Sequence, residues 1–135
     1  MGGWGWIRVG AILGFLAVGL GAFGAHGLKD RLEALGTSAS YQTAVQYHSL
    51  HAVALICVGI IGSMTKRGLA VELAGWSFLV GVVVFSGSLY VLSLTGVKWL
   101  GAITPIGGVA LLVGWLALAS AAGPIGQPTP IEESK

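Results

Sequence analysis

Four long apolar stretches constrain the fold of this chain more than any other feature. They cover residues 6–25, 42–64, 72–94 and 100–122. At about 1.5 Å per residue, each is long enough as a helix to cross the roughly 30 Å hydrocarbon layer of a membrane. Only 9% of the 135 residues are charged, against about 25% in an average soluble domain. We therefore predict an all-α integral membrane protein, built as a four-helix bundle.

The spans are expected to form a single transmembrane domain over residues 1–123. The Pro-rich and charged residues 124–135 are expected to be a disordered tail. A cleaved signal peptide is an alternative reading of the first span, since a basic Arg8 precedes an apolar run that ends in small residues. We favour a retained span, because the glycine content is high for a signal core.

A short amphipathic helix is predicted between the first two spans. Leu28, Leu32 and Leu35 follow helical spacing, with charged residues between them. Such a helix would lie along the membrane interface. Gly36 predicts its end.

Small residues recur along one face of the first and fourth spans. In lipid, small residues let neighbouring helix backbones approach each other closely. We assign a packing role to five glycines: Gly10, Gly14, Gly21, Gly107 and Gly114. Because these stripes offer more packing surface than one small bundle uses, they also favour a homo-oligomer or a larger membrane complex.

All three histidines, His26, His48 and His51, fall between residues 21 and 51. His26 ends one span and the other two open the next, so the topology predicts that they lie close together near the lipid boundary. Two histidines from different helices can ligate a b-type haem, and three can hold zinc or copper. A haem or transition-metal site is therefore an alternative function. No carboxylate is expected in the interior of a span to orient such ligands.

The second span is polar on two sides at 100° per residue. Tyr41, His48 and His51 share one side, and Gln42, Gln46 and Ser49 share another. Polar faces of this kind are costly in lipid. We therefore expect neither side to face the bilayer; each should be packed inside the bundle or line a wet cavity.

The third and fourth spans carry further polar groups. Ser86, Tyr90 and Ser93 share a helical face. In the fourth span, either the helix starts at Thr104, with Pro105 as its first residue, or it begins at Leu100 and is kinked by the proline. We favour the kinked helix. Broken helices and polar groups at mid-depth mark transport sites, so a small-solute channel or transporter is a further alternative.

Four motifs are distributed over nearly the whole apolar part of the chain. They are GAFGAHGL at residues 21–28, YHSLHAVAL at 47–55, FSGSLY at 85–90 and LGAITPIGG at 100–108. Together they resemble domain-of-unknown-function family 423, which includes bacterial inner-membrane proteins and the eukaryotic transmembrane protein 256. The resemblance implies a four-span membrane protein and no particular activity. His48 departs from the uncharged polar residue expected at its position.

The motifs supply the candidate residues of a ligand or cofactor site, and the first and third histidines are stronger candidates than the second. The candidates are His26, Tyr47, His48, His51, Ser86, Tyr90 and Thr104. No role is assigned to any of them.

Composition excludes several function classes. The net charge of +2 is small and scattered, which excludes a nucleic-acid partner. Cys57 is the only cysteine, which excludes a disulfide framework and a cysteine-based zinc site. No nucleophile–base pair stands out, so we expect no enzyme. The prediction is a non-enzymatic accessory, assembly or oligomeric component of a cell membrane, the bacterial inner membrane being the favoured location.

The orientation of the spans follows only weakly from the loops. Four positive residues are expected on the side of the membrane that holds both termini: Arg8, Lys66, Arg67 and Lys135. Three are expected on the other side: Lys29, Arg31 and Lys98. Positive charges concentrate on the cytoplasmic side, so the count slightly favours cytoplasmic termini.

Overall fold

The computed structural model describes residues 1–64 and 68–121, and the described residues form a bundle of helices. The elements are α1 (Gly3–His26), α2 (Lys29–Ala34), α3 (Ser38–Met64), α4 (Gly68–Gly81), the π-helix η1 (Val82–Ser86), α5 (Gly87–Thr95), the 3₁₀-helix η2 (Lys98–Ala102) and α6 (Thr104–Ala121). Four stretches are long and apolar enough to cross a membrane: α1, α3, the run from α4 to α5, and the run from η2 to α6. The predicted all-α four-span architecture is confirmed. The tail at 124–135 lies outside the described residues.

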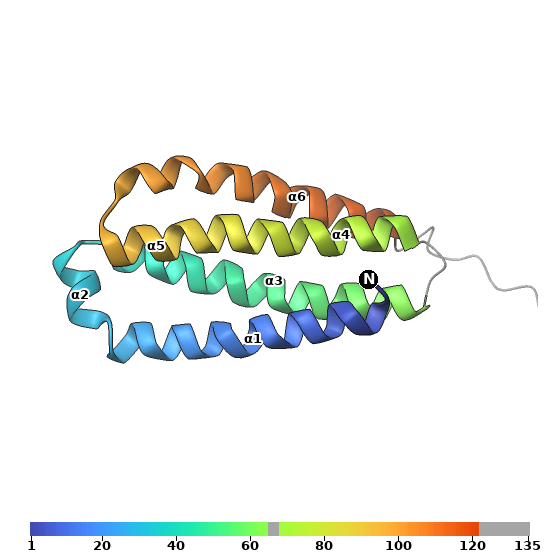
Figure 1. The fold of residues 1–135 in the computed structure, drawn as a ribbon, viewed down its shortest axis with the longest axis horizontal. Helices are drawn as coiled ribbons and strands as arrows, with labels where there is room; N and C mark the ends of the chain where they lie inside the picture. The colour runs from blue at the N-terminus through green and yellow to red at the C-terminus, as the bar shows by residue number, and fades with distance from the viewer. Residues whose placement is uncertain (65–67, 122–135) are drawn as a thin grey trace, which may run out of the picture.

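The spans follow one another across the molecule in chain order (Figure 1). α1 packs on α3, α3 packs on α4 and α5, and α4 with η1 packs on α6. α1 and α6 therefore lie on opposite sides of the molecule. The N-terminus and the last turn of α6 are at one end, and α2 is at the other (Figure 1). α1 packs along α3 for most of its length.

The glycine stripes of α1 and α6 face neighbouring helices of the same chain. A Cβ added to Gly10 would lie 2.7 Å from the carbonyl oxygen of Ala52, and one added to Gly107 would lie 2.4 Å from the backbone nitrogen of Phe85. At Gly114 an added Cβ would lie 2.5 Å from the Phe78 ring. Both helices thus pack too closely for a larger residue at these positions. Since the stripes are used within one bundle, they no longer argue for an oligomer.

The two remaining glycines of that set are less tightly enclosed. A Cβ on Gly21 would lie 3.3 Å from the Val45 side chain, and one on Gly14 would lie 4.0 Å from Cβ of Ala52. The first is a tight contact that a small shift relieves, and the second is an ordinary van der Waals contact. Of the three glycines assigned to packing on α1, Gly10 is therefore the most tightly enclosed.

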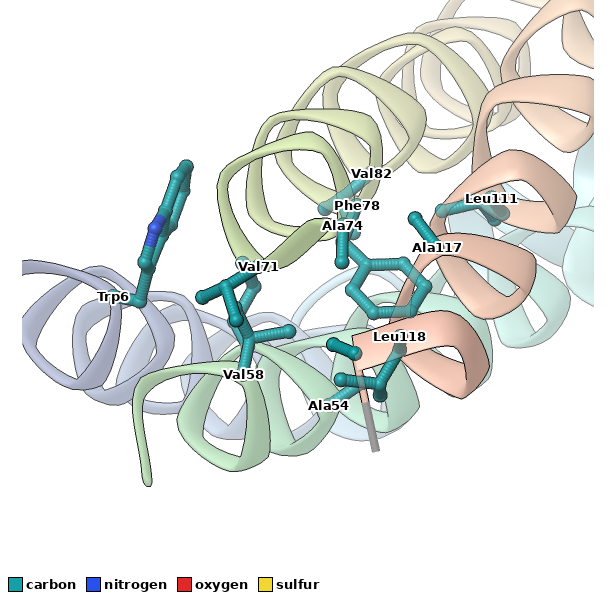
Figure 2. Packing of buried hydrophobic residues seen from close by; sticks show 12 residues of the cluster. Trp6, Ala54, Val58, Val71, Ala74, Phe78, Val82, Leu111, Ala117 and Leu118 are labelled. Carbon is teal, nitrogen blue, oxygen red and sulfur yellow. The ribbon is translucent and has the colours of Figure 1, made fainter. Parts of the chain in front are cut away.

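An apolar core fills the end of the bundle that holds the N-terminus (Figure 2). Its members come from all four spans: Trp6, Ala54, Leu55, Val58, Val71, Ala74, Phe78, Val82, Leu111, Ala117, Leu118 and Ala121. Phe78 points from α4 towards α6 and α3 (Figure 2). Trp6 is fully buried and meets Trp76 edge to face at 5.4 Å. It is a core residue.

At the opposite end, α2 covers the C-terminus of α5. The Arg31 guanidinium donates two hydrogen bonds, of 2.8 and 2.6 Å, to the carbonyl oxygen of Leu94. The Thr37 hydroxyl donates one of 2.8 Å to the carbonyl oxygen of Ser93. The last carbonyls of a helix have no partner within it, so these bonds cap α5. α2 ends at Ala34, and Gly36, the predicted terminator, follows two residues later with a positive φ of 64°.

The fourth span differs from the favoured prediction. A kinked α-helix from Leu100 is wrong, because Lys98–Ala102 forms a 3₁₀-helix and the α-helix begins at Thr104. Pro105 explains the break: it has no N–H to donate to the carbonyl four residues back, and its ring collides with that carbonyl. Thr104 instead places its hydroxyl 2.9 Å from Oγ of Ser88 on α5.

Candidate functional site

A polar contact between α3 and α5 occupies the half of the bundle nearest α2. Nδ1 of His48 lies 3.2 Å from the Tyr90 hydroxyl. Tyr41 packs edge to face against Tyr90 at 5.3 Å and donates its own hydroxyl to the carbonyl oxygen of Leu20 at 2.8 Å. These three side chains thus connect α1, α3 and α5. The polar side predicted for Tyr41, His48 and His51 does face the protein interior, because all three are buried.

Three buried polar atoms beside this contact have no hydrogen-bond partner among the described residues. They are Nε2 of His48 and the hydroxyl oxygens of Ser86 and Ser93. Leaving such a group unpaired costs about 1–3 kcal/mol, so native structures contain few of them. The face of α5 that meets His48 is therefore polar but incompletely paired.

His51 is the central residue of α3 and is fully engaged. Its Nδ1 lies 2.8 Å from the carbonyl oxygen of Tyr47. Its Nε2 lies 3.2 Å from the indole nitrogen of Trp115, which donates. A carbonyl only accepts, so Nδ1 carries the proton and the imidazole is neutral. Neither nitrogen is free to bind a metal without breaking a hydrogen bond.

A groove between α3 and α6 opens beside His51. We call it the α3–α6 groove; its volume is about 500 Å³. It is lined by Tyr47, Leu50, His51, Phe85, Pro105, Gly108, Val109, Leu111, Leu112 and Trp115. The Tyr47 ring packs on Phe85 at 4.5 Å and stacks beside His51 at 6.0 Å, yet Tyr47 remains 39% exposed. The groove is thus largely apolar, with its polar atoms near the middle of α3.

The three histidines do not converge. His26 is the last residue of α1 and is exposed, and α1 residue Gly24 lies against Tyr41 in the first turn of α3. His48 and His51 lie about 15 and 20 Å along α3 from its start at Ser38. In the described residues, no three His, Cys, Asp or Glu side chains are grouped to hold a metal ion. The residues present do not fit the metal or haem site proposed for them.

Sequence reasoning missed Trp115, which pairs with His51. An indole N–H in the interior of an apolar span needs a hydrogen-bond partner, and this requirement was the signal available. It also missed Glu72, which lies about one turn inside the third span because α4 starts at Gly68. The Trp6 indole nitrogen donates to the Glu72 carboxylate at 3.4 Å. The prediction that no carboxylate lies within a span is therefore wrong, because Glu72 does.

Comparison with known proteins decides the family. A sequence model described as "Protein of unknown function (DUF423)" matches residues 20–108, which include all four motifs. The chain belongs to the DUF423 family. Its relatives in this family include the UPF0382 membrane protein YwdK of Bacillus subtilis, 47% identical over 86% of this chain and 94% of the relative. No solved structure matches this chain.

Two staphylococcal relatives give the same picture. The UPF0382 membrane protein SSP2132 of Staphylococcus saprophyticus is 47% identical over 83% of this chain and 91% of the relative. A UPF0382 membrane protein of Staphylococcus epidermidis is 48% identical over 85% and 92% respectively. These names state a membrane location and no activity. Together with the four apolar helices, they establish this DUF423 chain as a multi-pass membrane protein.

Proposed function

We propose that this protein is a non-enzymatic membrane component that works by associating with a second copy through the α3–α6 groove. The observation that carries the proposal is the partial exposure of Tyr47 and Trp115, two aromatic side chains with polar atoms, in the groove beside His51. Polar groups at membrane depth are normally covered by protein or water rather than lipid. A helix laid in the groove covers the exposed parts of both rings.

A second copy fits because α6 presents a ridge beside the groove that it lines. The ridge consists of Ile106, Val109, Leu112 and Leu116, each more than half exposed, and Val109 and Leu112 also form the wall that it shares with the groove. Their spacing of three to four residues puts them on one side of the helix. A two-fold axis beside α6 places the ridge of each copy against the groove of the other, which makes the contact self-complementary. An oligomeric accessory or assembly role follows from such a contact.

The alternative functions have less support in the described residues. A haem needs two free imidazole nitrogens at one depth, but His26 lies at the membrane edge of α1 and His48 lies deep in α3. A channel needs a polar path through the bundle. The buried polar groups occupy the α2 half, and fully buried Leu55, Val58 and Phe78 fill the other half.

Cysteine cross-linking in native membranes tests the association. Cys57→Ser removes the only native cysteine, and single cysteines then replace Ile106, Val109, Leu112 and Leu116 in turn. Phe15→Cys, on the exposed face of α1, is the control. We expect disulfide-linked dimers from the α6 series and only a background level from the control. Equal yields at all sites, together with a monomeric mass in nanodiscs, would show that the groove does not receive a second copy.

A further inference from the structure

A second groove lies between α1, α2 and α3, on the far side of α3 from the α3–α6 groove. We call it the α1–α3 groove; its volume is about 680 Å³. It is lined by Gly21, Gly24, Ala25, Lys29, Leu32, Glu33, Ser38, Tyr41, Gln42, Val45 and Gln46. Lys29, Leu32 and Glu33 of α2 line it, so it lies at the end of the bundle that carries α2. Because α1 ends and α3 begins there, the groove opens where the headgroup layer meets the hydrocarbon.

The wall of this groove on α1 is made of very small residues. Gly24 lies against the Tyr41 ring, where an added Cβ would be 2.2 Å from Cε1, and Gly21 faces Val45. A larger side chain at Gly24 would collide with the Tyr41 ring, so the helices could not approach this closely. Together with Ala25, these glycines form an apolar wall against which an acyl chain can lie.

Two amides line the α3 wall of the same groove. Gln42 and Gln46 are one turn apart, both are exposed, and neither has a hydrogen-bond partner in the described part of the chain. Their side of α3 was expected to avoid lipid, yet it faces outwards. Amides at this depth require a polar occupant, because hydrocarbon satisfies neither their N–H groups nor their oxygens. The occupant must therefore be apolar at one end and polar at the other.

Opposite charges stand side by side at the rim. Nζ of Lys29 and a carboxylate oxygen of Glu33 are 4.0 Å apart, and both side chains are about 60% exposed. An ion pair so open to water contributes little to folding, so both charges remain available to a ligand. We propose that the α1–α3 groove binds a zwitterionic phospholipid whose headgroup joins a phosphate to a primary amine. Lys29 contacts the phosphate, Glu33 contacts the ammonium group, and the amides bind the ester region.

Competition between lipids tests this proposal. The full chain is placed in nanodiscs containing equal amounts of phosphatidylethanolamine, phosphatidylglycerol and phosphatidylcholine with identical acyl chains. Lipids that remain bound after transfer to detergent are counted by native mass spectrometry. We expect enrichment of phosphatidylethanolamine. Glu33→Gln should lower that enrichment about two- to fivefold, the range of an exposed ion pair, and leave phosphatidylglycerol unchanged.

Matched variants separate the site from a general charge effect. Lys29→Gln should lower retention of all three lipids, because each carries the phosphate. Asp30→Asn and Lys98→Gln remove the same charges at residues that do not line the groove, and should change nothing. Equal retention of the three lipids overturns the proposal, as does an equal loss in the controls. If a protein rather than a lipid occupies the groove, the three lipids should be retained equally. Cross-linking through α6 is unaffected in either case, so the two proposals fail separately.

Discussion

The two halves of the bundle are built from the same helices in opposite ways. The half near the N-terminus is filled by apolar side chains that are almost completely enclosed, among them Trp6, Leu55, Val58 and Phe78. The half near α2 buries hydroxyls, tyrosines and a histidine beside apolar residues such as Leu32, Leu89 and Leu92, and three of its buried polar atoms have no partner among the described residues. α3 and the third span pass through both halves. The difference therefore arises from which residues each helix presents, and not from the architecture.

The comparison teaches where stability and specificity reside. In lipid, apolar side chains gain little by leaving their surroundings, so the apolar half is held by closeness of fit. Gly75 illustrates this fit, since a Cβ added there would lie 2.3 Å from the Trp6 ring. The polar half is held by a few hydrogen bonds, and it keeps unpaired groups at a cost. We expect the first half to determine stability and the second to carry recognition.

The largest effect is expected in the apolar half. Phe78→Ala removes a fully buried ring that contacts His51 and Trp115 and should destabilise the fold by about 3 kcal/mol. This is the lower end of the range for such truncations, because the unfolded chain also keeps an apolar environment in lipid. The unfolding free energy in mixed micelles measures it. Phe15→Ala, on the lipid-facing side of α1, should change stability by less than about 0.5 kcal/mol.

An intermediate effect is expected where the two halves meet. His51→Phe keeps a ring of similar shape but leaves the Trp115 indole N–H without its acceptor, so we expect a loss of about 1–2 kcal/mol. The fluorescence maximum of Trp115 should shift at the same time, in a background where the other tryptophans are phenylalanine. His26→Phe, at an exposed position, is the reference. Equal stability of the two variants would mean that the hydrogen bond contributes nothing.

The smallest effect, and one of opposite sign, is expected in the polar half. Ser86→Ala removes an unpaired hydroxyl and should stabilise the protein by up to about 1 kcal/mol. Ser88→Ala, two residues away, removes a hydroxyl bonded to Thr104 and should instead destabilise it by about 0.6 kcal/mol. Melting temperatures measured side by side decide the sign. A destabilising Ser86→Ala would show that this hydroxyl has a partner, such as an ordered water, and would weaken the contrast.

The sequence predicts the four spans well, because long apolar runs leave a helix few alternatives in a membrane. The local sequence also predicts α2, from the spacing of its leucines, and the role of Gly36 in terminating it. The start of α6 was misjudged, although Pro105 is a sufficient cause of a break. The sequence does not predict η1, because no residue of Val82–Ser86 distinguishes a π-turn from an α-turn. The close approach of Gly107 to the backbone of Phe85 joins different spans and is not predicted either.

The candidate site is harder to predict than the fold. Helical spacing correctly puts His48 and His51 on a buried side, but it cannot say which partners they meet. Tyr90 and Trp115 reach them from two other helices, and the choice is made by packing angles that the sequence does not state. His26 was grouped with them by its nearness along the chain. His48 and His51 lie about 15 and 20 Å along α3, whereas His26 lies at the end of α1. α2 and its loops stay at the membrane edge between these two helices.

The π-helix has a consequence for how this bundle can change over evolutionary time. A π-turn takes up one residue more than an α-turn, and each residue advances a helix by about 100°. Deleting one residue within Val82–Val84 would restore an α-turn there and keep both α4 and the polar face of α5 in their present contacts. In an unbroken α-helix, one extra residue would instead turn that face by about 100°, away from His48. The π-turn thus lets the third span change its length by one residue without changing the face that meets α3.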